Sequence, residues 1–170
     1  EFNQANTLAF ANNLQASGAF AFSPGVLPNS SDIFIGILDD GSFQIPTKDN
    51  YRYANVFIHE IGHALGLKHP FDDPSPSGTI ATPPYLNDDE NNATWTQMSY
   101  SGGKRSYEFS PLDIAALQYL YGVNSSTRSG NDTYSFSELK SNFIWDGGGI
   151  DTIDASLSFE PVTIFLSPGY

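Results

Sequence analysis

The first forty residues carry apolar positions in two different periods. Near the N-terminus alanine and leucine recur at helical spacing before Gly18, which predicts a helix over Asn3–Leu14. Ala19–Phe22 is a short apolar run that stops at a Ser-Pro-Gly turn, so we predict a strand there. Asp32–Leu38 alternates and is rich in isoleucine, which predicts a second strand.

Two later segments have stronger helical patterns. Tyr53–Leu67 is predicted to be a helix that ends at Gly66, since glycine accepts the left-handed conformation that closes a helix. A second helix is predicted to begin at Ser110, where a serine cap, a proline and an acidic residue follow one another, and to end at Gly122. Pro70–Asn92, between them, lacks apolar periodicity and is predicted to be loop.

The amino-acid composition of the chain changes near residue 125, where Ser, Thr, Asn, Asp and Gly become frequent between β-forming residues. We therefore predict an α+β domain over residues 1–124 and the beginning of a β-rich domain over residues 125–170. The chain has no initiator methionine and ends in Pro-Gly-Tyr, a turn, so we interpret it as a fragment or a processed product.

Composition narrows the function classes. The net charge of −12 argues against nucleic-acid binding, because a phosphate backbone would be repelled. The absence of cysteine excludes disulfides, thiolate metal sites and cysteine nucleophiles, and fits either a cytosolic protein or an exoprotein stabilised by calcium. No apolar run reaches the roughly 20 residues that a membrane-spanning helix needs.

All 3 histidines of the chain lie in one short segment. His59 and His63 are four residues apart and share a helix face, with Glu60 on the same helix. In a continuous helix His69 would lie about 15 Å along the axis from His59. A zinc ligand must instead approach to about 2.0–2.1 Å of the ion, so the helix must break, and Gly66 stands where the break is needed.

Three neutral histidines leave one coordination position open for water, which is typical of catalytic rather than structural zinc. Zinc can lower the pKa of that water to about 7 and polarise a scissile carbonyl, and Glu60 would take the proton and pass it to the leaving amine. The alternative is a helix whose histidines are hydrogen-bonded in the core.

These residues resemble the metzincin clan of metallopeptidases, through His-Glu-x-x-His-x-x-Gly-x-x-His and a downstream Met-turn. Within the clan the chain is similar to the serralysin family. The features that carry this similarity are Pro70 after His69, the Met98-Ser99-Tyr100 turn, the helix Asp113–Gly122, and the segment Trp145–Thr152.

The resemblance implies a twisted sheet with an edge strand over the cleft, an active-site helix, a Met-turn and a C-terminal helix, followed by the start of a calcium-binding β-roll. It implies that Met98 is a hydrophobic floor under the metal. Tyr100 would be a zinc ligand in the resting enzyme and would donate to the oxyanion during turnover. Ordinary core packing is the alternative for both residues.

The resemblance also makes the first predicted strand a substrate-binding edge strand, formed by Ala19, Phe20, Ala21 and Phe22. An exposed strand edge can hydrogen-bond an extended peptide with little sequence preference. The apolar pattern fits equally an interior strand whose phenylalanines fill the core.

Two segments rich in glycine and aspartate match the family's first calcium site. Calcium takes oxygen ligands, and glycine permits the tight turns that bring such ligands together. The implied ligands are the carbonyls of Arg128, Gly130 and Asp132 together with Asp146, Gly148 and Asp151. Gly149 and Asp151 could serve a second ion. Polar surface turns without an ion are the alternative.

We therefore expect a secreted, extracellular zinc endopeptidase that cuts extended polypeptides and carries one catalytic zinc and one or more structural calcium ions. Glycine-rich nonapeptide repeats are absent, and the strands and first helix that the family places before the edge strand are missing or heavily shortened. An N-terminal segment or a C-terminal β-roll would therefore complete the fold. The alternatives are a non-catalytic zinc- and calcium-stabilised binding or adhesion module, and a small-molecule metallohydrolase.

Overall fold

The computed structural model describes residues 7–14, 18–37, 41, 51–71, 83–103, 106, 108–135 and 143–164. The chain divides into two compact units, Glu1–Gly122 and Val123–Tyr170. This division lies two residues before the predicted domain boundary, at the end of the second predicted helix. Each unit is described by itself.

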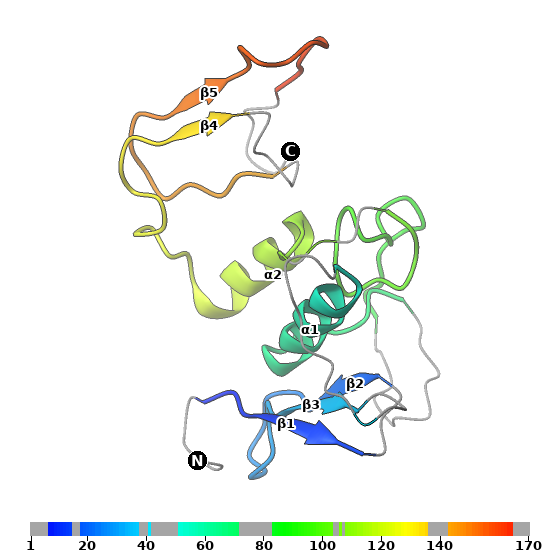
Figure 1. Cartoon of the computed structure of the whole chain (residues 1–170). Helices are drawn as coiled ribbons and strands as arrows, with labels where there is room; N and C mark the ends of the chain where they lie inside the picture. The colour runs from blue at the N-terminus through cyan, green and yellow to red at the C-terminus, as the bar shows by residue number, and fades with distance from the viewer. Residues whose placement is uncertain are drawn as a thin grey trace. The chain divides into compact units, whose positions relative to one another are not determined.

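A three-stranded sheet forms one layer of the first unit (Figure 1). Its strands are β1 (Phe10–Asn13), β2 (Ala19–Ala21) and β3 (Ile33–Gly36), in the order β1-β3-β2. β3 pairs in parallel with β1 and antiparallel with β2. The strands predicted over Ala19–Phe22 and Asp32–Leu38 are therefore confirmed, and β3 is the central strand of the described sheet.

The helix predicted over Asn3–Leu14 is wrong where the structure describes it. Phe10–Asn13 is β1, and the Ile33 N–H donates to the Ala9 carbonyl at 2.8 Å. A short isolated helix is marginal even in alanine-rich sequence, whereas a strand gains ladder hydrogen bonds and a buried face from its neighbour. Residues 3–6 lie outside the described residues.

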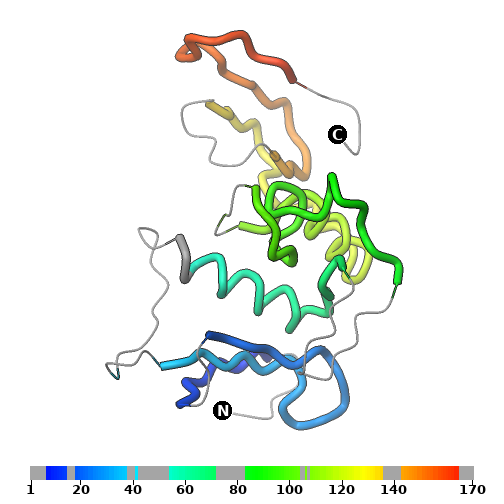
Figure 2. The backbone as a smooth tube through the Cα atoms, turned by 90° about the vertical axis from the view of Figure 1, so that its right-hand side faces the viewer, coloured from blue at the N-terminus to red at the C-terminus, as the bar shows by residue number. Residues whose placement is uncertain are grey.

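Helix α1 (Tyr51–Ala64) packs against one face of this sheet, as both backbone views show (Figures 1 and 2). The buried core between them contains Ile33, Ile35 and Ala64, with Phe57 and Ile61 of α1 packed against it. Ile33 and Ile35 point to the same face because strand side chains alternate. This packing fixes α1, and with it the histidine segment, on a rigid sheet.

The end of α1 explains how the chain turns toward His69. The Leu67 N–H donates to the Gly62 carbonyl and the Gly66 N–H to the His63 carbonyl, both at 2.9 Å. These two bonds form a Schellman motif, whose turn residue must be left-handed. Gly66 has φ +98° and meets this need. The predicted helix is confirmed, and it ends at Ala64, two residues before Gly66.

Helix α2 (Pro111–Tyr121) confirms the second predicted helix. The Asp113 carboxylate accepts a hydrogen bond from the Ser110 N–H at 2.9 Å. An acidic residue in the first turn therefore pairs with the backbone N–H of the residue that caps the helix. Gly122 closes the helix with an N–H bond to the Gln118 carbonyl. Residues 83–92, the larger described part of the predicted loop, contain neither helix nor strand.

The second unit contains a small parallel ladder of β4 (Thr133–Ser135) and β5 (Thr152–Asp154). With the sheet and helices of the first unit, this gives the chain the predicted α+β character. Among the described residues, no helix is long and apolar enough to cross a membrane.

Candidate metal centre

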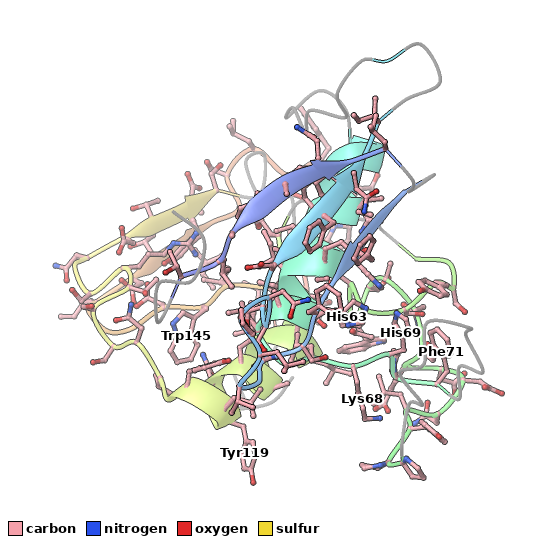
Figure 3. All side chains as sticks on the ribbon, turned by 90° about the horizontal axis from the view of Figure 1, so that it is seen from below. His63, Lys68, His69, Phe71, Tyr119 and Trp145 are labelled. Carbon is pink, nitrogen blue, oxygen red and sulfur yellow. The ribbon has the colours of Figure 1, made fainter. Side chains whose placement is uncertain are left out.

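The turn after α1 brings the three histidine rings into one cluster. The Nε2 atoms of His59, His63 and His69 lie 3.1 Å from one another in all three pairs. In tetrahedral zinc coordination, with bonds of about 2.0–2.1 Å, neighbouring ligand nitrogens are about 3.3–3.4 Å apart. The donor set and its spacing therefore fit a zinc ion. Figure 3 shows the His63 and His69 side chains close together at the end of α1.

The opposite ring nitrogens of two histidines are fixed by backbone carbonyls. His59 Nδ1 lies 2.8 Å from the Gln97 carbonyl, and His63 Nδ1 lies 2.9 Å from the Leu67 carbonyl. Because a carbonyl only accepts, each Nδ1 carries the proton, and each Nε2 keeps its lone pair for a metal. Partners of this kind orient ligand rings and raise their basicity.

Glu60 follows the first histidine on α1 and is buried. Burial raises the pKa of its carboxyl to about 7, and a backbone hydrogen bond with Ala21 of β2 opposes that shift. A carboxyl group with such a pKa can accept and release a proton near neutral pH. The bond to Ala21 also brings β2 next to the candidate base.

Met98 lies directly against the ligand helix. Its side chain is 2% exposed, and a Cβ built on Gly62 would overlap its sulfur. The methionine can therefore approach the helix between two ligands only because residue 62 has no side chain. Sequence reasoning singled out Met98 but missed Gly62, although its place between the two helical histidines was a usable signal.

Aromatic rings surround the third histidine. The Tyr100 ring lies 5.4 Å from that of His59 and 4.7 Å from that of His69, between centroids. Phe71, labelled next to His69 in Figure 3, stacks on that histidine at 5.1 Å with the planes 5° apart. The Phe71 ring also contacts Tyr100. Tyr100 is 58% exposed, so the described packing leaves its ring open to solvent. Phe71 was missed because it follows a proline in a predicted loop.

The proposed substrate strand lies at one end of the sheet order. Within the described residues β2 pairs with β3 alone, while Ala19 and Ala21 face the core under α1. Phe20 stacks on Phe34 at 4.9 Å on the other face, and Phe22, just past the strand, meets Phe34 edge-on. Both Phe20 and Phe22 are partly exposed, so these side chains do not fill the core beneath the helix.

The second unit holds an acidic cluster formed by Asp132, Asp146 and Asp151. One carboxylate oxygen from each lies within 4.8 Å of the others. The Tyr134 hydroxyl donates to Asp146, which lowers the pKa of that carboxyl. We expected the Asp132 carbonyl as a ligand; that carbonyl accepts the Thr152 N–H at 2.8 Å, and the cluster contains the Asp132 carboxylate.

The other implied calcium ligands lie on the two turns that carry these aspartates. A Cβ on Gly149 would overlap the Gly130 carbonyl oxygen, so the two turns approach closely. Arg128 has φ +48° and donates to the Trp145 carbonyl at 3.3 Å. Gly148 donates its N–H to the Asp146 carboxylate at 2.8 Å. The structure thus brings both glycine-rich turns together around the carboxylates.

Comparisons with known proteins agree with this centre. Residues 40–128, about half of the chain, match the metallo-peptidase family M12B, described as reprolysin-like. The chain is 35% identical to Serralysin B of Dickeya chrysanthemi over 91% of its own length and 38% of that protein. It is 38% identical to Serralysin of Proteus mirabilis over 73% of its length and 30% of that protein.

A third relative, Metalloprotease AprA of Pseudomonas entomophila (strain L48), is 35% identical over 88% of the chain and 37% of its own length. The chain thus spans less than two fifths of these relatives. The matched family covers the histidine cluster, the Met98 turn and α2. The chain belongs to the reprolysin-like metallopeptidases of family M12B and is a serralysin-like metzincin.

Proposed function

We propose that this chain is the catalytic part of a zinc endopeptidase that hydrolyses peptide bonds. The observation that carries this proposal is the cluster of three Nε2 atoms, each 3.1 Å from the other two, together with the burial of Glu60, the residue that follows His59 on α1. Three imidazoles hold zinc and leave a position open for chemistry. When bound, zinc acts as a Lewis acid that acidifies water and polarises a carbonyl.

The chain's own residues then carry the proton transfers. Glu60 accepts the proton of the attacking water at its carboxylate and delivers it to the leaving amine. Tyr100 would donate from its phenol to the oxyanion that develops on the substrate, and its oxygen would be a further ligand for zinc in the resting state. The ring contacts of Tyr100 with His59 and His69 support this role.

The substrate class follows from β2. An extended polypeptide pairs with the outer edge of this strand, formed by Ala19, Phe20 and Ala21, with Phe22 beyond it. The bond between Ala21 and Glu60 supports this placement, because it brings the strand within reach of the base. Main-chain pairing gives affinity with little dependence on substrate sequence.

We also propose structural calcium at the second unit, with residues 125–170 as the start of a β-rich calcium-binding domain. The ligands would be Asp132, Asp146 and Asp151 with oxygens of the turns that contain Arg128, Gly130, Gly148 and Gly149. Carboxylates that converge within 4.8 Å suit a hard cation. Secretion to the extracellular space fits a cysteine-free chain stabilised in this way.

The substitution Glu60→Gln tests the mechanism, since it removes the base and keeps the side chain's shape. We expect zinc content to stay unchanged and casein hydrolysis to fall by about 10²–10⁴-fold, the typical size of acid–base catalysis. Glu108→Gln, at an exposed carboxylate, is the matched control and should keep full activity. Turnover by Glu60→Gln at the wild-type rate would reject Glu60 as the base.

A further inference from the structure

One buried side chain connects the metal cluster to the rest of the first unit. Gln97, just before Met98, is 1% exposed, although glutamine is normally a surface residue. A buried amide is costly unless its groups are hydrogen-bonded. Both ends of the Gln97 amide have partners, and these partners lie on different elements.

The amide joins the two helices. Asn55 of α1 donates from Nδ2 to Gln97 Oε1 at 2.6 Å. Gln97 Nε2 donates to the hydroxyl of Ser110, the N-cap of α2, at 2.6 Å, and to the Ala93 carbonyl at 2.9 Å. The side chain is therefore held from both sides, and its direction is set by groups that are themselves buried.

The main chain of Gln97 is held as well. Its N–H donates to the Asp113 carboxylate at 2.7 Å, and that carboxylate also accepts from the Thr96 hydroxyl at 2.6 Å. The peptide carbonyl of Gln97 is the group that receives the His59 Nδ1–H at 2.8 Å. The same residue thus contacts α1, α2 and a metal-ligating ring.

We propose that Gln97 is a positioning residue for the metal centre. Its side-chain amide, fixed between Asn55 and Ser110, holds the carbonyl that orients His59 and sets its tautomer. This inference rests on the proposed zinc site. It goes beyond that site because it assigns a role to an amide that contacts neither metal nor substrate.

A purely structural role makes a different prediction. If Gln97 only filled space, methionine of similar volume and shape would serve, because volume-conserving replacements are tolerated best. If the amide orients His59, the replacement should loosen the imidazole while the fold persists. His63 provides an internal reference, since its Nδ1 is held by Leu67 instead.

The test compares wild type with Gln97→Met and Ser110→Ala, the second removing only one anchor of the amide. Ile33→Val is the matched control, because it weakens the buried core without touching the Gln97 network. Two quantities are measured at a temperature where each variant is folded. They are the zinc dissociation constant, by competition with a chromophoric chelator, and the exchange rates of the His59 and His63 Nδ1–H protons, by nitrogen-15 NMR.

Gln97→Met keeps the carbonyl that His59 contacts but removes the amide that holds this carbonyl in place. We therefore expect zinc binding to weaken by up to about 10- to 100-fold, the range found for outer partners of metal ligands, and Ser110→Ala to weaken it less. Exchange at His59 should accelerate and exchange at His63 should not. Zinc binding and His59 exchange unchanged in both variants would overturn the proposal. If Gln97→Met does not fold, Ser110→Ala decides by the same criteria. Failure of the wild type to bind zinc would instead reject the proposed function.

Discussion

At the scale of single residues, different kinds of contact hold the atoms of the metal centre in place. His59 is oriented by a loop carbonyl and His63 by a carbonyl at its own helix end. Glu60 is buried, and this burial raises the pKa of its carboxyl group to about 7. Met98 reaches the helix because Gly62 leaves room for its sulfur. Each contact involves a different pair of residues, so single substitutions can test them separately.

Gly62→Ala tests the close approach of Met98. In an open helix this change would stabilise by up to about 1 kcal/mol. Here the new Cβ would overlap the sulfur of the buried Met98 side chain, and overpacking typically costs about 1–3 kcal/mol. We therefore expect a lower free energy of unfolding by denaturant. Gly102→Ala, where a Cβ meets nothing within 4 Å, is the control, and an equal effect at both positions would contradict the contact.

Residue types and spacing were sufficient to single out His59, Glu60, His63 and His69, because the chemistry of a metal site restricts both. Partners from distant segments could not be predicted in this way. Gln97 lies 38 residues from His59, and its place beneath the ring depends on how the loop returns to α1. A glutamine in such a loop looks like a surface residue until the fold buries it.

At the scale of elements, the end of α1 decides whether the third ligand reaches the site. Gly66 was predicted to break the helix. In the structure Gly66 has φ +98°, and the two Schellman hydrogen bonds end the helix there. The prediction succeeded because glycine's conformational freedom is a local property. The helix predicted near the N-terminus failed because β1 is stabilised by β3, more than twenty residues away, and a local period does not contain that information.

The start of α2 supplies a pH-dependent prediction. Burial raises the pKa of the Asp113 carboxyl group above its ordinary value, and hydrogen bonds from Thr96, Gln97 and Ser110 oppose the shift. Between about pH 3.9 and the raised pKa, the folded state binds more protons at this group than the unfolded state. The contribution of Asp113 to the free energy of unfolding is therefore present below that pH range, and it is lost as the pH rises through the pKa of the folded state.

Asp113→Asn removes this titration. We expect the difference in unfolding free energy, wild type minus variant, to decrease as the pH is raised from about 3.5 to 7. Denaturant unfolding of the zinc-free proteins at several pH values measures it, and zinc is omitted so that histidine protonation does not enter through metal binding. A difference that grows with pH would contradict the sign of the shift.

At the scale of the whole molecule, the chain combines a first unit that carries the metal centre and a second unit whose carboxylates converge. The composition pointed to this division, since the change of texture near residue 125 lies close to the boundary between the units. The described ladder pairs only three residues of β4 with three of β5, and a two-stranded ladder is marginally stable by itself. A bound cation would offset the repulsion among its aspartates.

Calcium should therefore stabilise the second unit. An ion that binds only the folded state, at 100 times its dissociation constant, stabilises that state by about 2.7 kcal/mol. We therefore expect the melting temperature to rise when calcium is added back to protein from which a calcium-selective chelator has removed it. The change should be seen in the near-ultraviolet signal that includes Trp145. Asp146→Asn should reduce it and Asp88→Asn, an exposed acid of the first unit, should not. A calcium-independent melting temperature would count against the site.

In our proposal, His59, His63 and His69 hold a zinc ion that makes this chain a peptidase. Zinc content and casein cleavage, measured on one preparation of wild type and of His63→Ala, test it most directly. We expect about one zinc ion per wild-type chain and cleavage that a chelator abolishes, with both lost in the variant. A folded wild-type chain that contains no zinc, or zinc-loaded chain that does not cleave casein, would contradict it.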